Sequence, residues 1–562
     1  MHSACIFQKL NKVTKVMSED EKFEKLNIEM FQKVMEKNPN YATFFGLHDP
    51  YDWQMTDGSS EHVFENLELG RQWLNRMKET VNYDKLSNDH KIDWKIIELD
   101  YERSKFYVYE HRAWENNPDA FDEVGGTFFI MLTRNYASIE KRVDAIVARL
   151  EKLPLYLEQF RTRFERSQPV KLWTEVAIES CQQIPGLFQF IVAATKGAIS
   201  DELHSKLKGA VVNLQQPIKH HLEWLQSLLS RTKTEWTLGR EKFEKLLEIR
   251  GLGMTADEIY NLGVKYLQEL KDERAKLAQQ IASGKSIDEV MKLIEGKAPK
   301  SFEEALKATK EAMEKSKEFL IENDLATVYP DDRLHVEETP AFMAPLLPFA
   351  ALIPPGKFDK RQEGIYIVTR PKDVQNLGKH LNYASLLGTA VHEGFPGHFL
   401  QFAVSNRGSF VRLFAGGTET IEGWAHYCEE MMTEHGFIKG AEAQFMTVND
   451  GIWRAVRIIV DVKLSSGEMT FDEAVDMLMK EAGMSKEAAV AEVRRYTMTP
   501  GYALSYLLGK HLILMLREDI KKRMGKRFSE KFFHDTITAN GELPIAPLRE
   551  VFDMKLAELG IK

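Results

Sequence analysis

Most of the chain carries apolar residues at the spacing of an amphipathic helix. They recur at positions i, i+3, i+4 and i+7, with charged residues between them, most clearly in residues 139–153, 256–281 and 302–322. Thr255 and Ser301 precede two of these segments and are followed by acidic residues, as helix N-cap residues are. Pro154 is expected to end or kink the first helix, because proline lacks the N–H that a helix interior uses. The pattern predicts a mainly helical protein.

One stretch departs from this pattern. Between residues 327 and 371 the helical spacing stops and prolines become frequent. Within it, residues 333–337 and 364–370 alternate in polarity and contain β-branched side chains, which is typical of strands. We therefore expect a small sheet in an otherwise helical protein, with an edge strand that could line a substrate site. A proline-rich connector over the surface is an equal alternative.

Composition excludes several classes of protein. The 562 residues include 75 Lys+Arg and 84 Asp+Glu, a formal net charge of −9, and 43% are hydrophobic. This is ordinary globular composition, without the basic footprint of a nucleic-acid binder or a polybasic membrane patch. There are three cysteines, far apart in the sequence: Cys5, Cys181 and Cys428. A disulfide framework is therefore not expected. Residues 1–16 lack the apolar core of a signal sequence, and the expected location is the cytoplasm.

The sequence Ala-Val-His-Glu-Gly-Phe-Pro-Gly-His at residues 390–398 carries the residue types of a metal-dependent hydrolase. His392 and His398 can bind Zn²⁺ as neutral imidazoles, and Glu393 can act as a general base on an adjacent water. In the HExxH motif, two histidines four residues apart share one helix face. Here they are six apart. On a straight helix their side chains would point about 120° apart and lie about 9 Å apart along the axis.

The residues between the two histidines predict a break in the helix. Pro396 removes an interior N–H, and its ring clashes with the carbonyl four residues back. Gly394 and Gly397 permit backbone angles that other residues resist. We therefore expect a bulge or kink that absorbs the two additional residues and brings His398 round to His392.

A third ligand is expected from residues 418–432, which have the pattern of a helix. Glu422, His426 and Glu429 lie at positions i, i+4 and i+7, on one polar line along it. We predict Glu422 as the third ligand, with His426 and Glu429 supporting the ligands by hydrogen bonds. His426 as a direct ligand remains an alternative. Two imidazoles and a carboxylate favour one Zn²⁺ ion, although Co²⁺ or Mn²⁺ could occupy similar ligands.

With these motifs, the sequence resembles the DUF885 family, predicted zinc peptidases related to the gluzincin group. The resemblance covers nearly the whole chain and is carried by four motifs: His-Glu-x-x-Pro-Gly-His at 392–398, Glu-Gly-Trp-Ala-x-Tyr-x-Glu at 422–429, Arg-Tyr, Pro-Gly, Leu-Ser-Tyr and Gly within 495–509, and Pro-Asn-Tyr-Ala-Thr-Phe-Phe-Gly-Leu-His-Asp at 39–49. Two positions depart from the family pattern. Ser465 stands where many members have histidine, and His426 replaces the more usual leucine.

The resemblance and the chemistry together imply a mechanism. Glu393 would take a proton from the attacking water and deliver it to the leaving amine. A hydroxyl from Tyr506 or Tyr496 would stabilise the oxyanion, with Tyr502 as a further candidate. Arg495 could anchor a substrate carboxylate through its bidentate fork. For each tyrosine, core packing with a satisfied hydroxyl is the competing interpretation.

The predicted function is therefore a zinc-dependent metallopeptidase that hydrolyses oligopeptides, with carboxypeptidase-like action as one form. A metal-dependent hydrolase of another amide or ester and a catalytically silent helical binding protein are the alternatives. We expect no nucleic-acid or membrane partner. The oligomeric state stays open, with a dimer among the alternatives.

The predicted fold is mainly α. It is a large multi-helix metallopeptidase fold with a deep cleft and a small β-sheet inserted before the metal-binding helix. We expect four parts: a flexible tail over residues 1–16, a helical region over 17–326 that forms one wall of the cleft, a proline-rich segment with short strands over 327–375, and a catalytic helical region over 376–562.

Overall fold

The structure is a computed structural model that describes residues 17–339, 350–371 and 377–561, so the expected tail lies outside the described residues. The chain divides into two compact units. Unit 1 holds Met1–Thr234 and Gly356–Lys360, and unit 2 holds Glu235–Pro355 and Arg361–Lys562. The expected region 17–326 is therefore divided between the units, because the helices after residue 234 pack with the C-terminal helices. Its role as the wall of a cleft stays a prediction.

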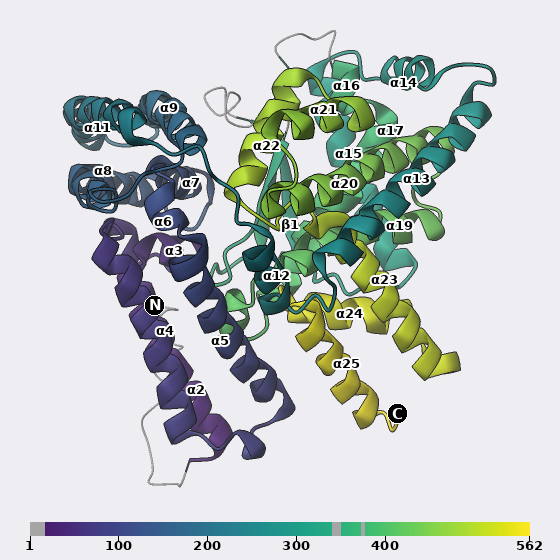
Figure 1. Ribbon diagram of the computed structural model, residues 1–562, viewed down its shortest axis with the longest axis horizontal. Helices are drawn as coiled ribbons and strands as arrows, with labels where there is room; N and C mark the ends of the chain where they lie inside the picture. The colour runs from purple at the N-terminus through teal and green to yellow at the C-terminus, as the bar shows by residue number, and fades with distance from the viewer. Residues whose placement is uncertain (1–16, 340–349, 372–376, 562) are drawn as a thin grey trace. The chain divides into compact units, whose positions relative to one another are not determined.

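The named secondary-structure elements of unit 1 are all helical among its described residues (Figure 1). Its α-helices are α2 (Glu19–Lys37), α3 (Pro39–Phe44), α4 (Ser60–Thr80), α5 (Asn88–Phe106), α6 (Ala113–Asn116), α7 (Phe121–Thr133), α8 (Ile139–Thr162), α9 (Lys171–Thr195), α10 (Asp201–Asn213) and α11 (Gln215–Leu228). Short helical turns are η2 (Tyr51–Trp53), η3 (Tyr83–Lys85), η4 (Tyr107–His111) and η5 (Leu229–Arg231).

Of the two outcomes expected at Pro154, an end or a kink of its helix, the first does not occur. Helix α8 continues through Pro154 to Thr162. The buried side chains of Leu150, Leu153 and Leu157 form one apolar face on both sides of the proline. Burial of this face offsets the one backbone hydrogen bond that the proline removes.

A partly buried ion-pair network fixes residues 356–360 within unit 1. The His48 ring bridges two carboxylates, with Nδ1 3.1 Å from Asp52 Oδ2 and Nε2 3.2 Å from Asp359 Oδ1. Its face stacks on the Tyr136 ring, with the ring centroids 3.3 Å apart. Gly46 has a φ of +90°, and a Cβ there would lie 2.8 Å from the backbone nitrogen of Asp359. The motif at residues 39–49 therefore serves to hold a distant segment of the chain.

Unit 2 contains the remaining helices and the sheet (Figure 1). Its α-helices are α12 (Arg240–Ile249), α13 (Ala256–Ile281), α14 (Ile287–Glu295), α15 (Phe302–Glu322), α16 (Leu377–Leu381), α17 (Tyr383–Thr389), α18 (His398–Ser405), α19 (Thr418–Glu434), α20 (Ala441–Ser466), α21 (Phe471–Ala482), α22 (Lys486–Met498), α23 (Ser505–Met524), α24 (Glu530–Asn540) and α25 (Ile545–Glu558). Three shorter turns are η7 (Ala390–Gly394), η8 (Phe410–Phe414) and η9 (Gly525–Arg527).

Two helix pairs organise unit 2. Helix α13 lies beside α20, and α19 lies beside α23 (Figure 1). In the second pair the backbones nearly touch, since a Cβ on Gly423 would lie 2.4 Å from the carbonyl carbon of Gly509. Only glycine at both positions permits this approach. The predicted bounds of α13 and α15 are confirmed, as are their caps at Thr255 and Ser301.

The expected small sheet is confirmed. Its strands are β1 (Arg333–Glu338), β2 (Ala350–Ile353) and β3 (Glu363–Val368), in the order β1-β3-β2. β1 runs parallel to β3, and β2 runs antiparallel to it. Helix α15 covers the sheet through a core cluster that includes Met313, Tyr366 and Ala390. Gly364 of β3 lies against the Phe399 ring of α18, so the sheet is next to the segment that carries the histidines.

The protein is thus mainly α with one small sheet, as predicted. Within the described ranges, no helix is both long and apolar enough to cross a membrane.

The His48 bridge should make the stability of unit 1 depend on pH. Burial lowers the pKa of His48, but the carboxylates of Asp359 and Asp52 raise it by more, so the pKa lies above its ordinary value. Protonation therefore favours the folded state. The stabilisation that protonation contributes is fully present below the ordinary histidine pKa of about 6.5 and is lost as pH rises through the raised pKa. Chemical unfolding followed across this range should show a slope that His48→Gln removes; an equal slope in both proteins would contradict the bridge.

Candidate metal centre

The helix breaks between the two motif histidines, as the spacing predicts. Helix α17 runs into the wider turn η7, Phe395 is extended, and α18 begins at His398. The backbone N–H of Gly397 donates to the carbonyl of Val391 over 2.9 Å, which folds the segment back on itself. The His392 and His398 rings then lie with their centroids 4.8 Å apart and nearly perpendicular. The expected bulge is confirmed.

Gly397 is the residue that makes this turn sterically feasible. A Cβ on it would lie 1.9 Å from the carbonyl oxygen of His392 and 2.3 Å from that of Val391. No side chain can occupy such a space without a shift of the backbone. Trp424 of α19 supports the same turn, because its indole N–H donates to the carbonyl of Pro396 over 2.9 Å.

Helix α19 supplies the third side chain of the site. Ligand atoms of His392, His398 and Glu422 all lie within 4.8 Å of one another, and all three residues are buried. The closest pair is His398 Nε2 and Glu422 Oε2, 3.3 Å apart. Among the described residues, this is the group of histidine, cysteine and acidic side chains that could hold a metal ion. Two imidazoles and a carboxylate converging on one point are the donor set of a zinc site with a position left for water.

Glu429 orients His392 from behind. Its Oε1 lies 2.7 Å from His392 Nδ1, so that nitrogen carries the proton and Nε2 is left for an ion. Arg454 of α20, which the sequence did not suggest, lies 3.7 Å from the same carboxylate oxygen. Burial raises the pKa of Glu429, but Arg454, His426 and His392 lower it by more, to well below its ordinary value. The carboxylate therefore stays charged and keeps its hold on the imidazole.

The pKa values within the group of three follow from the same proximity. Burial raises the pKa of Glu422, but His398 and then Tyr502 lower it further, to about 2. Burial lowers the pKa of His398, but the Glu422 carboxylate raises it above its ordinary value. Nδ1 of His398 is buried and has no hydrogen-bond partner. The Glu422 carboxylate contacts the other ring nitrogen, Nε2. A cation between the two groups would satisfy both of them.

His426 lies beside the site but outside the group of three. It is 1% exposed, its Nδ1 is 3.4 Å from Glu429 Oε2, and neither ring nitrogen makes a hydrogen bond. Burial lowers its pKa to about 3, so the ring is neutral. Its position supports a role next to Glu429. Cys428 is buried and free and also lies outside the group.

Tyr502 is the tyrosine that reaches the ligands. Its hydroxyl donates to Glu422 Oε1 over 2.6 Å. The turn that carries it is held from α20 by Asp461, whose carboxylate accepts from the backbone N–H groups of Gly501 and Leu504. Arg250 donates to the carbonyl of Gly501. Sequence reasoning ranked Tyr502 below two other tyrosines, because these supporting contacts join distant parts of the chain.

The departure at Ser465 falls within this support. Its hydroxyl donates to Asp461 Oδ1 over 3.0 Å, and the side chain is buried. Ser465 therefore contacts Asp461, and Asp461 in turn binds the backbone of the turn that carries Tyr502.

The other predicted catalytic residues occupy different places. Tyr506 packs its ring against Tyr502, with the centroids 6.1 Å apart. Tyr496 is buried in the core cluster of α20 to α22, and its hydroxyl accepts from Arg457 Nε over 2.9 Å. The Tyr496 hydroxyl is thus bonded to Arg457 and not to His392, His398 or Glu422. This favours the core-packing interpretation. Arg495 lies beside the Tyr502 ring and pairs with Glu492.

Glu393 lies between the two histidines in sequence but does not join their group. It is half-buried, and it makes no hydrogen bond or ion pair with any described residue. Its charge acts on His398 and on Tyr366 of β3, so the carboxylate lies near both. Glu393 is therefore a carboxylate without a partner among the described residues, next in sequence to the candidate ligand His392.

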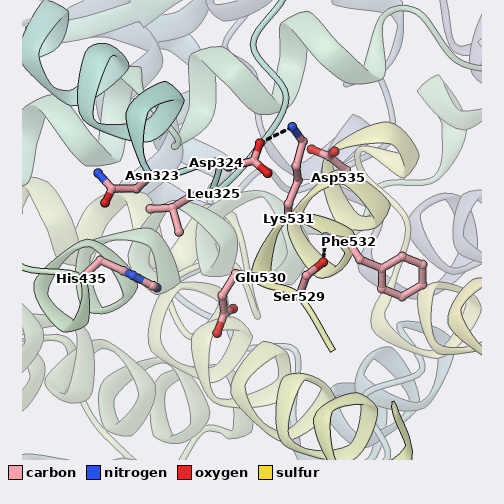
Figure 2. A pocket seen from close by; sticks show the side chains of 9 residues that line it. All are labelled: Asn323, Asp324, Leu325, His435, Ser529, Glu530, Lys531, Phe532 and Asp535. Carbon is pink, nitrogen blue, oxygen red and sulfur yellow. Dashed lines mark hydrogen bonds and ion pairs between the residues drawn. The ribbon is translucent and has the colours of Figure 1, made fainter. Parts of the chain in front are cut away.

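A surface pocket of about 560 Å³ lies elsewhere in unit 2, between the ends of α15 and α19 and the start of α24 (Figure 2). Figure 2 shows Lys531 directed to Asp324, with which it forms an ion pair of 2.5 Å. None of the lining residues belongs to the group of three ligands.

Comparisons with known proteins show the family and the fold. Residues 39–552 match the family model described as "Bacterial protein of unknown function (DUF885)". A structure described as "a putative lipoprotein of unknown function from Shewanella oneidensis" is 24% identical, with a TM-score of 0.76, over 94% of this chain and 99% of that one. A second, "the putative lipoprotein from Colwellia psychrerythraea", is 19% identical, with a TM-score of 0.82, over 97% and 100%. No curated protein matches the sequence.

The turn at Gly397 should be essential for the centre. Gly397→Ala forces a methyl group against two carbonyl oxygens, and we expect it to lower the free energy of unfolding by about 1–3 kcal/mol and to weaken zinc binding at least about tenfold. Gly388→Ala, one turn before His392, is the matched control, since a Cβ there meets only ordinary contact distances. Isothermal titration with zinc checks both. Equal affinity in the two variants would show that the turn does not govern the site.

Proposed function

The chain belongs to the DUF885 family, and from its site we propose that it is a zinc-dependent metallopeptidase acting on oligopeptides. The observation that carries the proposal is the convergence of ligand atoms from His392, His398 and Glu422 within 4.8 Å, with Glu393 free beside them. His392, His398 and Glu422 would hold the ion. When bound, it would lower the pKa of a water molecule toward neutrality and polarise the scissile carbonyl.

The residues around this site supply the proton transfers. Glu393 accepts the proton of the attacking water and returns it to the nitrogen of the leaving amine as the peptide bond breaks. Glu429, through Nδ1 of His392, keeps that imidazole in one tautomer and orientation throughout.

Tyr502 is the residue that we assign to the oxyanion. Its hydroxyl already lies 2.6 Å from Glu422, so a small rotation would let it donate to the carbonyl oxygen as negative charge develops there. Burial and the Glu422 carboxylate raise the pKa of Tyr502 above its ordinary value, and the hydroxyl therefore keeps its proton. Tyr506, whose ring packs against Tyr502, would position it.

Several expectations remain part of this proposal. They are the oligopeptide substrate, the deep cleft, the cytoplasmic location and the lack of a nucleic-acid or membrane partner. Hydrolysis of another amide or ester needs the same metal and base, and only the substrate separates it from the peptidase. A binding protein without turnover would not require Glu393.

Zinc should stabilise the protein through the three proposed ligands. At a free zinc concentration of about 100 times the dissociation constant, the gain in free energy of unfolding is about 2.7 kcal/mol, and the melting temperature should rise accordingly. His398→Ala should abolish this rise. Glu429→Gln should weaken zinc binding by about 10- to 100-fold. His435→Ala, at the end of the same helix α19, is the control, and a rise retained in His398→Ala would refute the assigned ligands.

The general base can be tested separately from the metal. In Glu393→Gln we expect peptide hydrolysis to fall by about 10²- to 10⁴-fold, because the amide cannot accept the proton of water, while zinc content stays the same. Glu314→Gln, an exposed position on α15, is the matched control. Digestion of a peptide library followed by mass spectrometry gives the activity, and elemental analysis gives the metal. Undiminished cleavage by Glu393→Gln would refute its role, and zinc-loaded protein that cleaves no peptide would refute the peptidase.

A further inference from the structure

A cluster of positive charge lies one aromatic ring away from the group of three ligands. The guanidinium of Arg495 lies 5.8 Å from the centroid of the Tyr502 ring, whose hydroxyl contacts Glu422. The guanidinium of Arg457 lies 4.5 Å from the centroid of the Tyr506 ring. The two tyrosine rings contact each other, so both arginines border the site through them.

The two arginines share a single carboxylate. Arg457 Nη2 lies 3.1 Å and Arg495 Nη2 lies 2.7 Å from the same oxygen, Oε2 of Glu492. Within the described part of the chain, neither arginine forms an ion pair with another acidic residue. Two positive charges against one negative charge leave a net charge of +1 on the group formed by Arg457, Arg495 and Glu492. The Glu422 carboxylate is a separate charge, at the Tyr502 hydroxyl. An uncompensated cation at a partly enclosed position attracts an anion.

Only one of the two guanidinium groups is open to a ligand. Arg457 is buried, its Nε donates to the Tyr496 hydroxyl, and its Nη2 donates to Glu492. The Arg495 side chain is 40% exposed and uses only Nη2, so its Nε and Nη1 donate to no described residue. Free donors in a planar fork are what carboxylate recognition uses.

The distance from the site suits the leaving side of a peptide. Successive residues of an extended peptide are about 3.3–3.6 Å apart, so a carboxylate one or two residues beyond the scissile bond lies within a few ångströms of the reacting carbonyl. The Arg495 guanidinium lies 5.8 Å from the centroid of the Tyr502 ring, whose hydroxyl we assign to that carbonyl. An oxyanion at Tyr502 and a carboxylate at Arg495 can therefore belong to one substrate.

We propose that Arg495, with Arg457 behind it, binds a carboxylate of the substrate on the leaving side of the scissile bond. The substrate class is then peptides with a negative charge there, supplied either by the free C-terminus or by an acidic side chain. This inference rests on the proposed peptidase function. Arg495 is a specificity-determining residue, and Glu492 sets how much positive charge it presents.

Three matched peptides test the proposal and separate the two sources of charge. The first ends in a free C-terminal carboxylate, and the second is the same peptide with an amidated C-terminus. The third is also amidated but has glutamate as its last residue. With zinc-loaded wild type, we expect KM for the free acid to be about tenfold lower than for the plain amide, as one charge-assisted contact provides. A low KM for the glutamate amide would identify the side chain as a source. If KM for the glutamate amide is no lower than for the plain amide, the contact is made by the free C-terminus.

Variants decide whether Arg495 carries this preference. In Arg495→Met the acid-to-amide ratio should fall close to one, and Arg495→Lys should keep part of it. Glu492→Gln should enlarge the ratio, because it removes the shared negative charge. Arg361→Met, a change at an exposed arginine, is the control and should keep the wild-type ratio. A merely structural role of Arg495 would alter the cleavage of acid and amide alike, and a ratio that survives in Arg495→Met would overturn the proposal.

A binding measurement keeps the inference separable from the peptidase. Calorimetry with an N-acetylated amino acid, as free acid and as amide, needs no turnover. Wild type should bind the acid about tenfold more tightly than the amide, and Arg495→Met should lose most of this difference. Any attraction of the carboxylate to the metal is common to both proteins. If no peptide is cleaved but this difference is found, the peptidase fails and the carboxylate site stands; equal binding of acid and amide by wild type refutes the carboxylate site.

Discussion

The structure of the site depends on a backbone that must fold back on itself between His392 and His398. Two imidazoles six residues apart cannot meet on a straight helix. They meet here because the N–H of Gly397 bonds to the carbonyl of Val391 and because Gly397 has no side chain to strike the carbonyl oxygens beneath it. With that turn in place, α18 starts at His398 with its ring against that of His392. Trp424 then ties the turn to α19, the helix that carries Glu422.

A second close approach fixes the other side of the site. Helices α19 and α23 cross at Gly423 and Gly509, with their backbones nearly in contact. This crossing sets the separation between Glu422 and the turn before α23, so that the Tyr502 hydroxyl can reach the carboxylate. Asp461 and Arg250 hold that turn by its backbone. Rigid elements thus place the candidate ligands and the Tyr502 hydroxyl together, as the proposed catalysis by positioned groups requires.

What the sequence could predict was governed by local interactions. The bounds of α13 and α15 followed from helical spacing and a capping residue, and Glu422 followed from its place on one helix face. The role of Tyr502 did not, since it depends on Asp461 and Arg250, which are far away in sequence, and nothing at residue 502 marks them. The sequence makes Tyr496 equally suitable, but in the structure its hydroxyl accepts from Arg457. Strand β2 was not predicted because its four residues, Ala-Ala-Leu-Ile, show no alternation. Helix α8 does not end at Pro154, because buried leucines lie on both sides of the proline.

X-ray absorption at the zinc edge of the zinc-loaded protein tests the central claim most directly. The account predicts a first shell of two imidazole nitrogens at about 2.0–2.1 Å and carboxylate or water oxygens at about 2.0–2.2 Å, and predicts that this shell is lost in His398→Ala. A shell containing sulfur at about 2.3 Å, or one unchanged in that variant, would contradict it, because the ion would then lie away from the turn on which the whole site is built.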